Sequence, residues 1–484
     1  MVIFKQSENY CFFMAVLKDN WGLYTDFYEL SMAQGYFYSG KKNDSATFNY
    51  FFRTNPFKGG FTVFAGLQDF LELLENFTYS ESDISYLKEQ GFHSDFLNYL
   101  KDFQFSGNIT SVQEGEIVFQ NEPVLQVEGN IIESQLIESL LLNILNFESL
   151  IATKAFRIKL VAGDRIFTDF GLRRAQGFGA LHASRAAIIG GAASTSNVLA
   201  GKLFGIPVSG TQAHSWVQSF DTELEAFRTY AGAHPENGIL LVDTYDTLKS
   251  GVPNAIKVAK EMEGRSEKLK AIRLDSGDLA YLSKKARIML DDAGLDYVKI
   301  IASNQLNEHV IKSLLKDQDA KIDAFGIGTE LITGKEDAAL DGVYKLTETN
   351  GKPKMKISEN IEKVTLPGKK QVYRCLDEYG YFYRDAVALA EEKKQDIEHI
   401  FHPVYPERFT NVKNCSRHPL LQTVVEKGKN ITDKKSPSEI HEYLLSRSSQ
   451  LPDEHKRFIS PHIYKVGITR KLMESRNALA KKLE

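Results

Sequence analysis

The sequence predicts an α/β fold with a parallel sheet, and three observations support this prediction. Apolar strand-like segments alternate with helix-like segments between residues 165 and 326. Successive strand ends from Val208 to Ala302 lie 30 to 34 residues apart, which is the repeat length of a strand followed by a helix. Polar or glycine residues follow the strands, as they do at an active-site edge of such a sheet. A closed barrel and an open doubly wound sheet both fit this rhythm.

Composition sets the broad class of the protein. At 484 residues, with 43% hydrophobic and 25% charged residues, the chain is expected to form two or three globular domains. The net charge of -4 gives no reason to expect a nucleic-acid partner. Cys11, Cys375 and Cys415 are odd in number and widely spaced, so we expect no disulfide framework and a reducing cytoplasm. No apolar run approaches the roughly 18 residues of a membrane span.

The N-terminal part, residues 14–150, is predicted to be a mixed α+β segment. Residues 1–13 lack the apolar core of a signal peptide, and Met14 precedes better-patterned sequence, so we interpret them as an extension or a misassigned start. The first helix is predicted over 24–39, with Thr25 and Asp26 at its start and Gly40 after its end. We then predict a strand at 46–52, helices at 67–77 and 82–100, a β-rich patch at 108–128, and an apolar helix at 131–151, buried in the protein or at a subunit contact.

The central part, residues 151–340, carries the alternation of strands and helices. Strands are predicted at 165–170, 206–208, 239–242, 271–274, 298–302 and 324–326, with helices at 247–262, 279–293 and 307–316. The last part, residues 341–484, begins with short alternating strands, and Asn350-Gly351 is a strong signal for a two-residue hairpin. It ends in a charged, helical and partly loop-like tail from about residue 391.

Chemically versatile residues gather after the predicted strands. They are Arg173 and Arg174; Thr211 and His214; Asp243 and Asp246; Arg273, Asp275, Ser276 and Asp278; Ser303 and Asn304; and Gly326, Gly328 and Thr329. Arginine suits a phosphate or a carboxylate, and aspartate suits ribose hydroxyls or magnesium. Backbone N–H groups at a glycine-rich helix start suit a phosphate. The pattern predicts an anionic substrate but not which bond is broken.

Each of these residues also has a purely structural interpretation. A polar residue after a strand, such as Ser276 or Asp278, is most often a helix N-cap. An arginine pair is usually a surface feature, and a lone histidine such as His214 is more often structural than catalytic. The coincidence of such residues at successive strand ends favours an active site on this edge of the sheet.

Six motifs in a fixed order make a more specific prediction possible. They are TDFYELSMAQGYF, FTDFGLRRAQG, STSNVLAGKLFGIPVSGTQAHS, LVDTYDT, RLDSGDL and FGIGTELIT. In them the chain resembles the nicotinate phosphoribosyltransferase family from Tyr24 through Leu346, with weaker similarity to the end. The resemblance implies an irregular α/β barrel of the type II phosphoribosyltransferase kind, with a second α+β domain built from N- and C-terminal segments. It also implies a homodimer with the active site at the subunit interface.

The family's reaction joins nicotinate to 5-phosphoribosyl 1-pyrophosphate, with linked ATP hydrolysis, and forms nicotinate mononucleotide and pyrophosphate in NAD salvage. By resemblance, His214 is the histidine that ATP phosphorylates transiently, since an imidazole can accept and release a phosphoryl group near neutral pH. Asp243 is similar to the carboxylate that orients this histidine. Mg²⁺ is expected to arrive with the phosphates, so we predict no dedicated metal site on the protein.

The resemblance also implies the ligand contacts. Phe170 is similar to the aromatic residue that stacks on the pyridine ring, and Tyr28 to the residue that a partner subunit places on the other face. The residues around the nicotinate carboxylate and the adjoining phosphates are expected to be Arg173, Thr211 and Arg273. Phosphoribosyl pyrophosphate is expected to contact Arg273, Asp275, Asn304, Gly328 and Thr329.

Ser196 bears on the choice between the acid and the amide. The related enzyme that uses nicotinamide has an aspartate at this position. An aspartate there would face the nicotinate carboxylate, and such a like-charge contact costs several kcal/mol, more than the about 1–3 kcal/mol of a lost hydrogen bond. Serine removes this repulsion and can donate a hydrogen bond, which favours nicotinate. The structural alternative is that Ser196 is a helix N-terminal residue.

Two rival functions are less consistent with the sequence. Quinolinate phosphoribosyltransferase shares the barrel type and the product, but it needs a more basic pocket for two carboxylates and has no need of a phosphorylatable histidine. An inactive relative that only binds nucleotides or other proteins would be free to lose His214, Arg273, Asp275 and the Gly-Ile-Gly-Thr loop, which are all present.

Overall fold

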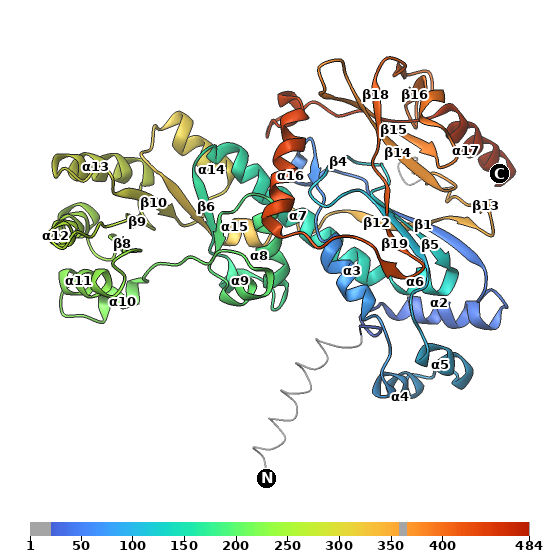
Figure 1. Ribbon diagram of the computed structural model, residues 1–484, viewed down its shortest axis with the longest axis horizontal. Coiled ribbons are helices and arrows are strands. Elements are labelled where there is room, and N and C mark those ends of the chain that lie inside the picture. Colours follow the sequence, from blue (N-terminus) through green and yellow to red (C-terminus); the bar gives the residue numbers. More distant parts are fainter. Residues whose placement is uncertain (1–20, 358–364, 484) are drawn as a thin grey trace, which may run out of the picture. The chain divides into compact units, whose positions relative to one another are not determined.

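The computed structural model describes residues 21–357 and 365–483, which form two compact units (Figure 1). Unit 1 takes the described residues within Met1–Leu150, Ala339–Lys435 and Glu442–Glu484, and unit 2 takes Ile151–Ala338 and Ser436–His441. Unit 1 therefore combines N- and C-terminal segments of the chain. The interpretation of residues 1–13 as an extension lies outside the described residues.

Unit 2 is built on a six-stranded parallel sheet. Its strand order is β7 (Ser194–Thr195), β6 (Ile166–Asp169), β11 (Ala324–Ile327), β10 (Lys299–Ser303), β9 (Ala271–Leu274) and β8 (Ile239–Leu241). In the middle of the sheet, Ile301 of β10 pairs with Ala324 on one side and with Arg273 on the other. All of these strands except β7 are among the predicted ones, and the mixed α/β class is confirmed.

The order of these strands bears on the choice between a barrel and an open sheet. The first strand, β6, lies beside the last, β11, and the other strands follow in chain order, as they do around a barrel. The strand predicted at 206–208 is reduced to one parallel bridge between Val208 and Thr195, because Pro207 has no N–H to donate to a ladder. Within residues 151–338 no ladder joins Val208 to β8, so the observed sheet is an open half-barrel.

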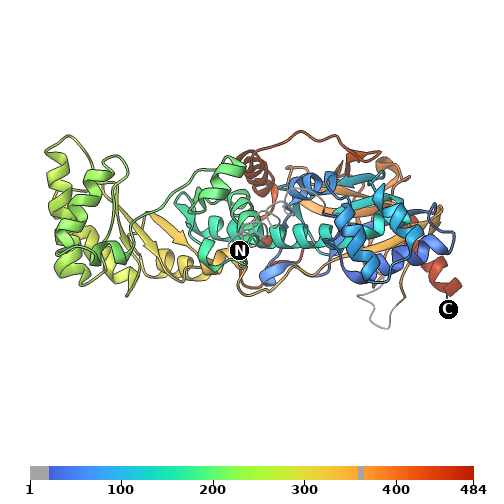
Figure 2. The same ribbon diagram turned by 90° about the horizontal axis from the view of Figure 1, so that it is seen from below.

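Helices cover this sheet. They are α8 (Gly179–Ile189), α9 (Val198–Phe204), α10 (His214–Gln218), α11 (Glu223–Ala233), α12 (Val252–Glu263), α13 (Leu279–Asp292), α14 (Glu308–Lys312) and α15 (Thr329–Ile332). The helix predicted at 247–262 begins with a π-helical turn, Thr247–Gly251, and the one predicted at 307–316 ends with another, Ser313–Asp317. Figures 1 and 2 show α11, α12 and α13 beside β8 and β9. Val258 of α12 and Leu290 of α13 belong to one hydrophobic core with the buried residues of these strands.

Unit 1 contains two larger sheets. The first has the order β13 (Lys352–Pro353), β12 (Gly342–Thr349), β1 (Ser45–Phe52), β5 (Leu125–Asn130), β3 (Asn108–Ser111), β19 (Gln422–Glu426) and β20 (Lys429–Asn430). The second has the order β17 (Phe409–Asn411), β16 (His399–Phe401), β21 (Val466–Ile468), β15 (Phe382–Leu389), β14 (Lys370–Leu376) and β18 (Ser416–Pro419), and a small pair joins β2 (Thr62–Val63) to β4 (Ile117–Val118). Antiparallel pairing of β1 with β12 ties the N-terminal segment to the C-terminal one.

The helices of unit 1 correct two predictions. They are α2 (Phe27–Tyr38), α3 (Leu67–Glu75), α4 (Glu81–Glu89), α5 (Ser94–Lys101), α6 (Ile131–Leu136), α7 (Glu138–Ala162, which continues into unit 2), α16 (Pro437–Gln450, which begins in unit 2) and α17 (Arg470–Leu483). The single helix predicted at 82–100 is two helices, because the chain turns at Gly91 with φ +92°. The apolar helix predicted at 131–151 is α6 followed by α7, which extends to Ala162.

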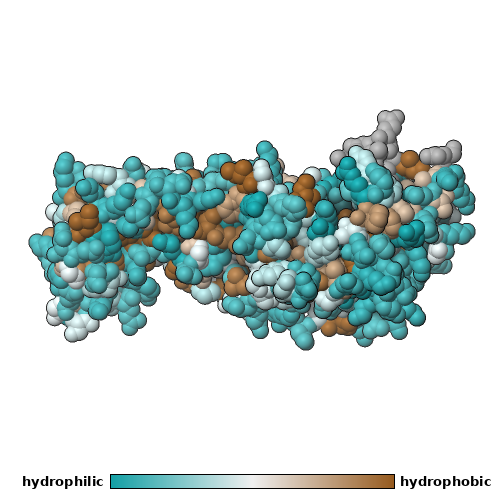
Figure 3. Space-filling model, turned by 90° about the horizontal axis from the view of Figure 1, so that it is seen from above, coloured by the Kyte–Doolittle hydropathy of each residue, from teal (hydrophilic) through white to brown (hydrophobic). Residues whose placement is uncertain are grey.

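Several local predictions are confirmed. Gly40 adopts a left-handed φ of +78° after α2, and Asn350 and Gly351 both have positive φ in the hairpin between β12 and β13. None of the helices in the described part of the chain is long and apolar enough to cross a membrane. The visible face of each unit is mostly hydrophilic (Figure 3), in keeping with apolar side chains packed inside.

Candidate active site

The carboxyl ends of the parallel strands in unit 2 carry most of the predicted site residues. Phe170 follows β6, Ser196 follows β7, Asp243 lies two residues after β8, Asp275 follows β9, Asn304 follows β10, and Gly328 follows β11. Because the strands are parallel, these ends lie along one edge of the sheet. The structure therefore places these residues on one rim, as the alternation in the sequence predicts.

His214 is the first residue of α10, and its two ring nitrogens have different surroundings. Nδ1 lies 3.0 Å from the hydroxyl of Thr244, whereas Nε2 lies 3.9 Å from Oδ2 of Asp275. The side chain is 40% exposed. A proton on Nδ1, donated to Thr244, leaves the lone pair of Nε2 free to act as a nucleophile.

Asp243 makes different contacts from those implied for it. Its Oδ2 accepts hydrogen bonds from the backbone N–H of Asp275 at 2.9 Å and from the hydroxyl of Ser276 at 2.6 Å. In unit 2 as described, no hydrogen bond joins Asp243 to His214, so its orienting role stays a prediction. Thr244, which does contact the ring, was missed by sequence reasoning, although it lies beside Asp243 in the LVDTYDT motif.

Arg273 and Thr211 are brought together by the structure. The guanidinium of Arg273 donates a hydrogen bond to the hydroxyl of Thr211, and its Nε is buried with no partner among the described residues. Burial lowers the pKa of Arg273, the carboxylates of Asp275 and Asp243 raise it, and the charge of Arg173 lowers it. Arg173 is exposed on a short turn after β6. Two guanidinium groups thus contribute positive potential on this rim.

Asp275 and Asn304 meet where β9 and β10 end. Oδ1 of Asp275 accepts a hydrogen bond from the hydroxyl of Ser303, which fixes the carboxylate. Asn304 and Gln305 follow with φ of +85° and +46°. Residues other than glycine rarely adopt a positive φ, and residues strained in this way cluster at ligand sites.

Phe170 lies between the two ends of β6 and β11. Its N–H donates to the carbonyl of Ile327 at 2.8 Å, and its ring packs over Gly326. A Cβ at Gly326 would lie 2.4 Å from this ring, closer than any van der Waals contact permits. A glycine at position 326 is therefore required for the Phe170 ring to occupy its position.

The resemblance implies that Phe170 stacks on the pyridine ring of nicotinate. On that prediction we expect Gly326→Ala, which displaces the Phe170 ring, to raise the KM for nicotinate at least about tenfold, because a misplaced ring no longer orients the substrate. Overpacking should also lower the free energy of unfolding by about 1–3 kcal/mol. Steady-state kinetics and denaturant unfolding measure the two effects. Gly232→Ala in α11 is the control, since a Cβ there meets nothing within 4 Å and should leave KM unchanged. An unchanged KM in Gly326→Ala would contradict the platform.

Ser196 lies just before α9 but does not cap it. The N-cap is Asn197, whose side chain accepts a hydrogen bond from the N–H of Ala200. The backbone N–H of Ser196 donates to the carbonyl of Asp169 at 2.7 Å, and its half-buried hydroxyl makes no hydrogen bond in the described chain. The hydroxyl is thus available for a ligand. Ser196 is nevertheless next to the N-terminus of α9, as the structural alternative has it, and its contact with a ligand stays a prediction.

Gly328 and Thr329 begin α15, as the sequence predicts. The carbonyl of Gly328 accepts hydrogen bonds from the N–H groups of Leu331 and Ile332. A Cβ on Gly328 would lie 3.3 Å from the carbonyl oxygen of Phe170, so the loop packs tightly against the end of β6. Their contact with a phosphate stays a prediction.

Tyr28 belongs to unit 1, whereas the other predicted residues belong to unit 2. It lies on α2, is 48% exposed, and its pKa is raised by desolvation and by the carboxylates of Glu138, Glu29 and Asp26. An exposed, un-ionised phenol can stack on a ring. Its placement on a partner's substrate stays a prediction.

Two carboxylates at the ends of β8 and β9 fit the magnesium ion that the resemblance implies. Oδ1 of Asp243 is buried and has no hydrogen-bond partner in the described structure, and Asp275 is partly exposed. Hard oxygen donors are the ligands that Mg²⁺ prefers, usually together with phosphates. These two residues match that donor set.

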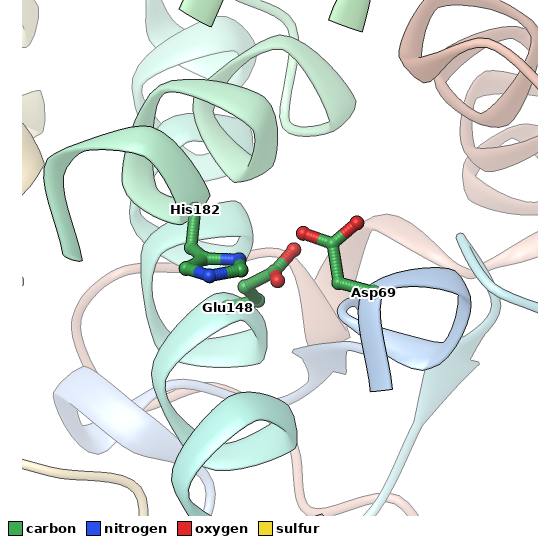
Figure 4. A group of neighbouring side chains, drawn as sticks. All are labelled: Asp69, Glu148 and His182. Carbon is green, nitrogen blue, oxygen red and sulfur yellow. The ribbon is translucent and has the colours of Figure 1, made fainter. Parts of the chain in front are cut away.

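A second pair of carboxylates lies inside unit 1. Asp69 on α3 and Glu148 on α7 are buried, and their oxygens lie within 4.8 Å of each other (Figure 4). Both make further interactions, so we assign the pair to the polar interior of unit 1. His182, also labelled there, is a residue of α8 in unit 2.

Comparison with protein families gives matches along most of the chain. Residues 166–393 match the model of the nicotinate phosphoribosyltransferase (NAPRTase) family. Residues 23–146 match the model of the NAPRTase N-terminal domain, and residues 369–476 match that of the C-terminal domain.

Individual relatives agree with these matches. Proteins named nicotinate phosphoribosyltransferase are 46% identical in Bacillus subtilis, over 93% of both chains, and 38% identical in Caenorhabditis elegans, over 93% of this chain and 92% of that one. The crystal structure of human nicotinic acid phosphoribosyltransferase superposes with a TM-score of 0.84 at 30% identity, over 94% of this chain and 99% of that one. A nicotinate-nucleotide pyrophosphorylase from Pyrococcus furiosus gives 0.70 at 26% identity, over 89% of this chain and 95% of that one.

Proposed function

The chain belongs to the nicotinate phosphoribosyltransferase family, and we propose that it joins nicotinate to 5-phosphoribosyl 1-pyrophosphate, forming nicotinate mononucleotide and pyrophosphate for NAD salvage. The observation that carries this proposal is the rim of unit 2, where Arg273, Asp275 and His214 lie together in a chain 46% identical to a relative of that name. Cations and carboxylates on one rim suit a substrate with phosphates and a ribose.

The transfer requires positioning and charge stabilisation more than proton transfer. The carbon of the ribose becomes oxocarbenium-like as the C–O bond to pyrophosphate breaks and the C–N bond to the pyridine nitrogen forms. Arg273 stabilises the leaving phosphates, and the carboxylate of Asp275 holds the ribose hydroxyls. Phe170 supports the pyridine ring, with Arg173 and Thr211 near its carboxylate. Mg²⁺, held with the phosphates by Asp243 and Asp275, would offset the charge of the leaving group.

ATP hydrolysis is coupled to the phosphoribosyl transfer through His214. Nε2 attacks the γ-phosphorus of ATP, ADP leaves, and water later releases the phosphoryl group as inorganic phosphate. The contact of Nδ1 with Thr244 supports this assignment of the nucleophilic nitrogen. Asn304, Gly328 and Thr329 complete the phosphate contacts on the adjoining strand ends.

We expect Ser196→Asp to raise the KM for nicotinate at least about tenfold and to improve the relative use of nicotinamide. The new carboxylate repels that of nicotinate, although partial exposure screens the repulsion. Ser196→Asn, which adds similar volume without charge, is the matched control. KM values for both substrates provide the measurement, and equal effects of Asp and Asn would refute the charge argument.

The assembly that completes this site is a homodimer in the cytoplasm, in which Tyr28 of one subunit covers the substrate of the other. The exposure of Tyr28 on α2 supports this arrangement. The cyclic order of the strands in unit 2 supports an irregular barrel as the parent architecture.

The decisive experiment measures product formation from nicotinate, nicotinamide and quinolinate, each with phosphoribosyl pyrophosphate and with or without ATP. We expect turnover of nicotinate, stimulated by ATP, and little turnover of the other two. Preferred use of quinolinate would establish the rival enzyme, and no turnover of any substrate would favour an inactive binding protein.

A further inference from the structure

Asp169, the last residue of β6, is a fully buried carboxylate. Its Oδ1 accepts the N–H of Gly171 at 2.7 Å, and its Oδ2 accepts the hydroxyls of Ser184 at 2.8 Å and Thr195 at 2.7 Å. No cationic side chain of the described residues forms an ion pair with it. One side chain thus joins the turn after β6, helix α8 and the end of β7.

The hydrogen bonds around this carboxylate all run in one direction. The backbone N–H of Asn197 donates to Thr195 Oγ1 at 3.0 Å, and the amide of Asn197 donates to Ser184 Oγ at 3.4 Å. Both hydroxyls then donate to Asp169, which is the member of this network that only accepts. An asparagine at position 169 would point an N–H₂ group at neighbours that are themselves donors, so some of these hydrogen bonds would be lost.

Asp169 makes hydrogen bonds next to two of the proposed ligand residues, Phe170 and Ser196. Its side chain holds the N–H of Gly171, directly after Phe170, and its main-chain carbonyl accepts the N–H of Ser196 at 2.7 Å. We propose that Asp169 is a positioning residue that fixes the Phe170 platform relative to Ser196 and thereby sets the preference for nicotinate. This inference rests on the proposed function of the site.

Asp169→Asn in the full-length protein tests the proposal. We expect the KM for nicotinate to rise about tenfold with a smaller change in kcat, because displacements well below an ångström already weaken orientation. The ratio of kcat/KM for nicotinate to kcat/KM for nicotinamide should fall about tenfold, since Ser196 is no longer held at a fixed distance from the Phe170 ring. A purely structural role would lower the amount of folded enzyme without changing KM or this ratio.

A second pair of variants keeps the test valid if Asp169→Asn fails to fold. Thr195→Val removes one donor to the carboxylate and should shift KM and the ratio in the same direction, whereas Thr195→Ser retains the hydroxyl and should restore both. Val258→Ala, in the core beside β8 and β9, is the stability control and should leave KM and the ratio unchanged. Wild-type values in Asp169→Asn or Thr195→Val overturn the inference, whereas a wild type that does not use nicotinate overturns the proposed function itself.

Discussion

In the His214→Ala variant we expect ATP to lose its stimulating effect completely. In the proposed mechanism Nε2 takes the phosphoryl group, and alanine provides no replacement for it. Residual turnover should persist at a level that does not respond to ATP, because the proposed contacts of Arg273 with the leaving phosphates and of Asp275 with the ribose hydroxyls are kept in this variant. Initial rates with and without ATP, together with transfer of label from γ-labelled ATP to the protein, measure both parts of this expectation.

A matched histidine separates this effect from general damage. His234 is exposed at the end of α11, where its ring contacts Tyr230, and it makes no contact with the proposed site. His234→Ala should keep the ATP response and the labelling. ATP stimulation that survives in His214→Ala would refute the phosphohistidine, whatever the remaining rate.

Much of unit 2 could be predicted because hydrophobic alternation and strand spacing are local signals. The strands at 239–242, 271–274 and 324–326 were found within a residue or two for this reason. β7 was missed because its two residues are too few for a pattern, and Pro207 broke the strand predicted next to it. Closure of the sheet depends on pairing between distant segments, about which a local pattern is silent.

The sequence predicts which residues lie on the rim of unit 2, but not which of them contact one another. The family motifs named His214 and Asp243, yet the ring of His214 contacts Thr244 and faces Asp275 instead. The sequence does not predict a positioning role for Asp169, since an aspartate at the end of a strand is most often interpreted as a helix N-cap. Only the fold shows that hydroxyls from two other elements converge on it.

Replacing Arg273 by lysine is expected to reduce kcat/KM for phosphoribosyl pyrophosphate about 100- to 1000-fold. The guanidinium of Arg273 donates one N–H group to Thr211, and its buried Nε has no hydrogen-bond partner in the described part of the chain. The other N–H groups can therefore bind a ligand while Thr211 fixes the side chain. A lysine keeps the charge, but its ammonium group lies on a flexible chain and lacks the planar set of N–H donors. Loss of a preorganised donor to the charge that develops in the transition state typically costs about 100- to 1000-fold in rate.

Arg228→Lys in the same unit is the matched control, because its exposed guanidinium pairs with Glu261 at 2.6 Å. A solvent-exposed pair of this kind contributes little to stability and lies outside the proposed site, so the kinetics should match those of the wild type. Thr211→Val should reproduce part of the Arg273→Lys defect, since it frees the guanidinium from its anchor while keeping its charge. If Arg273→Lys retained the wild-type kcat/KM, charge alone would account for phosphate binding on this rim, and the role proposed for the N–H groups of the guanidinium would be wrong.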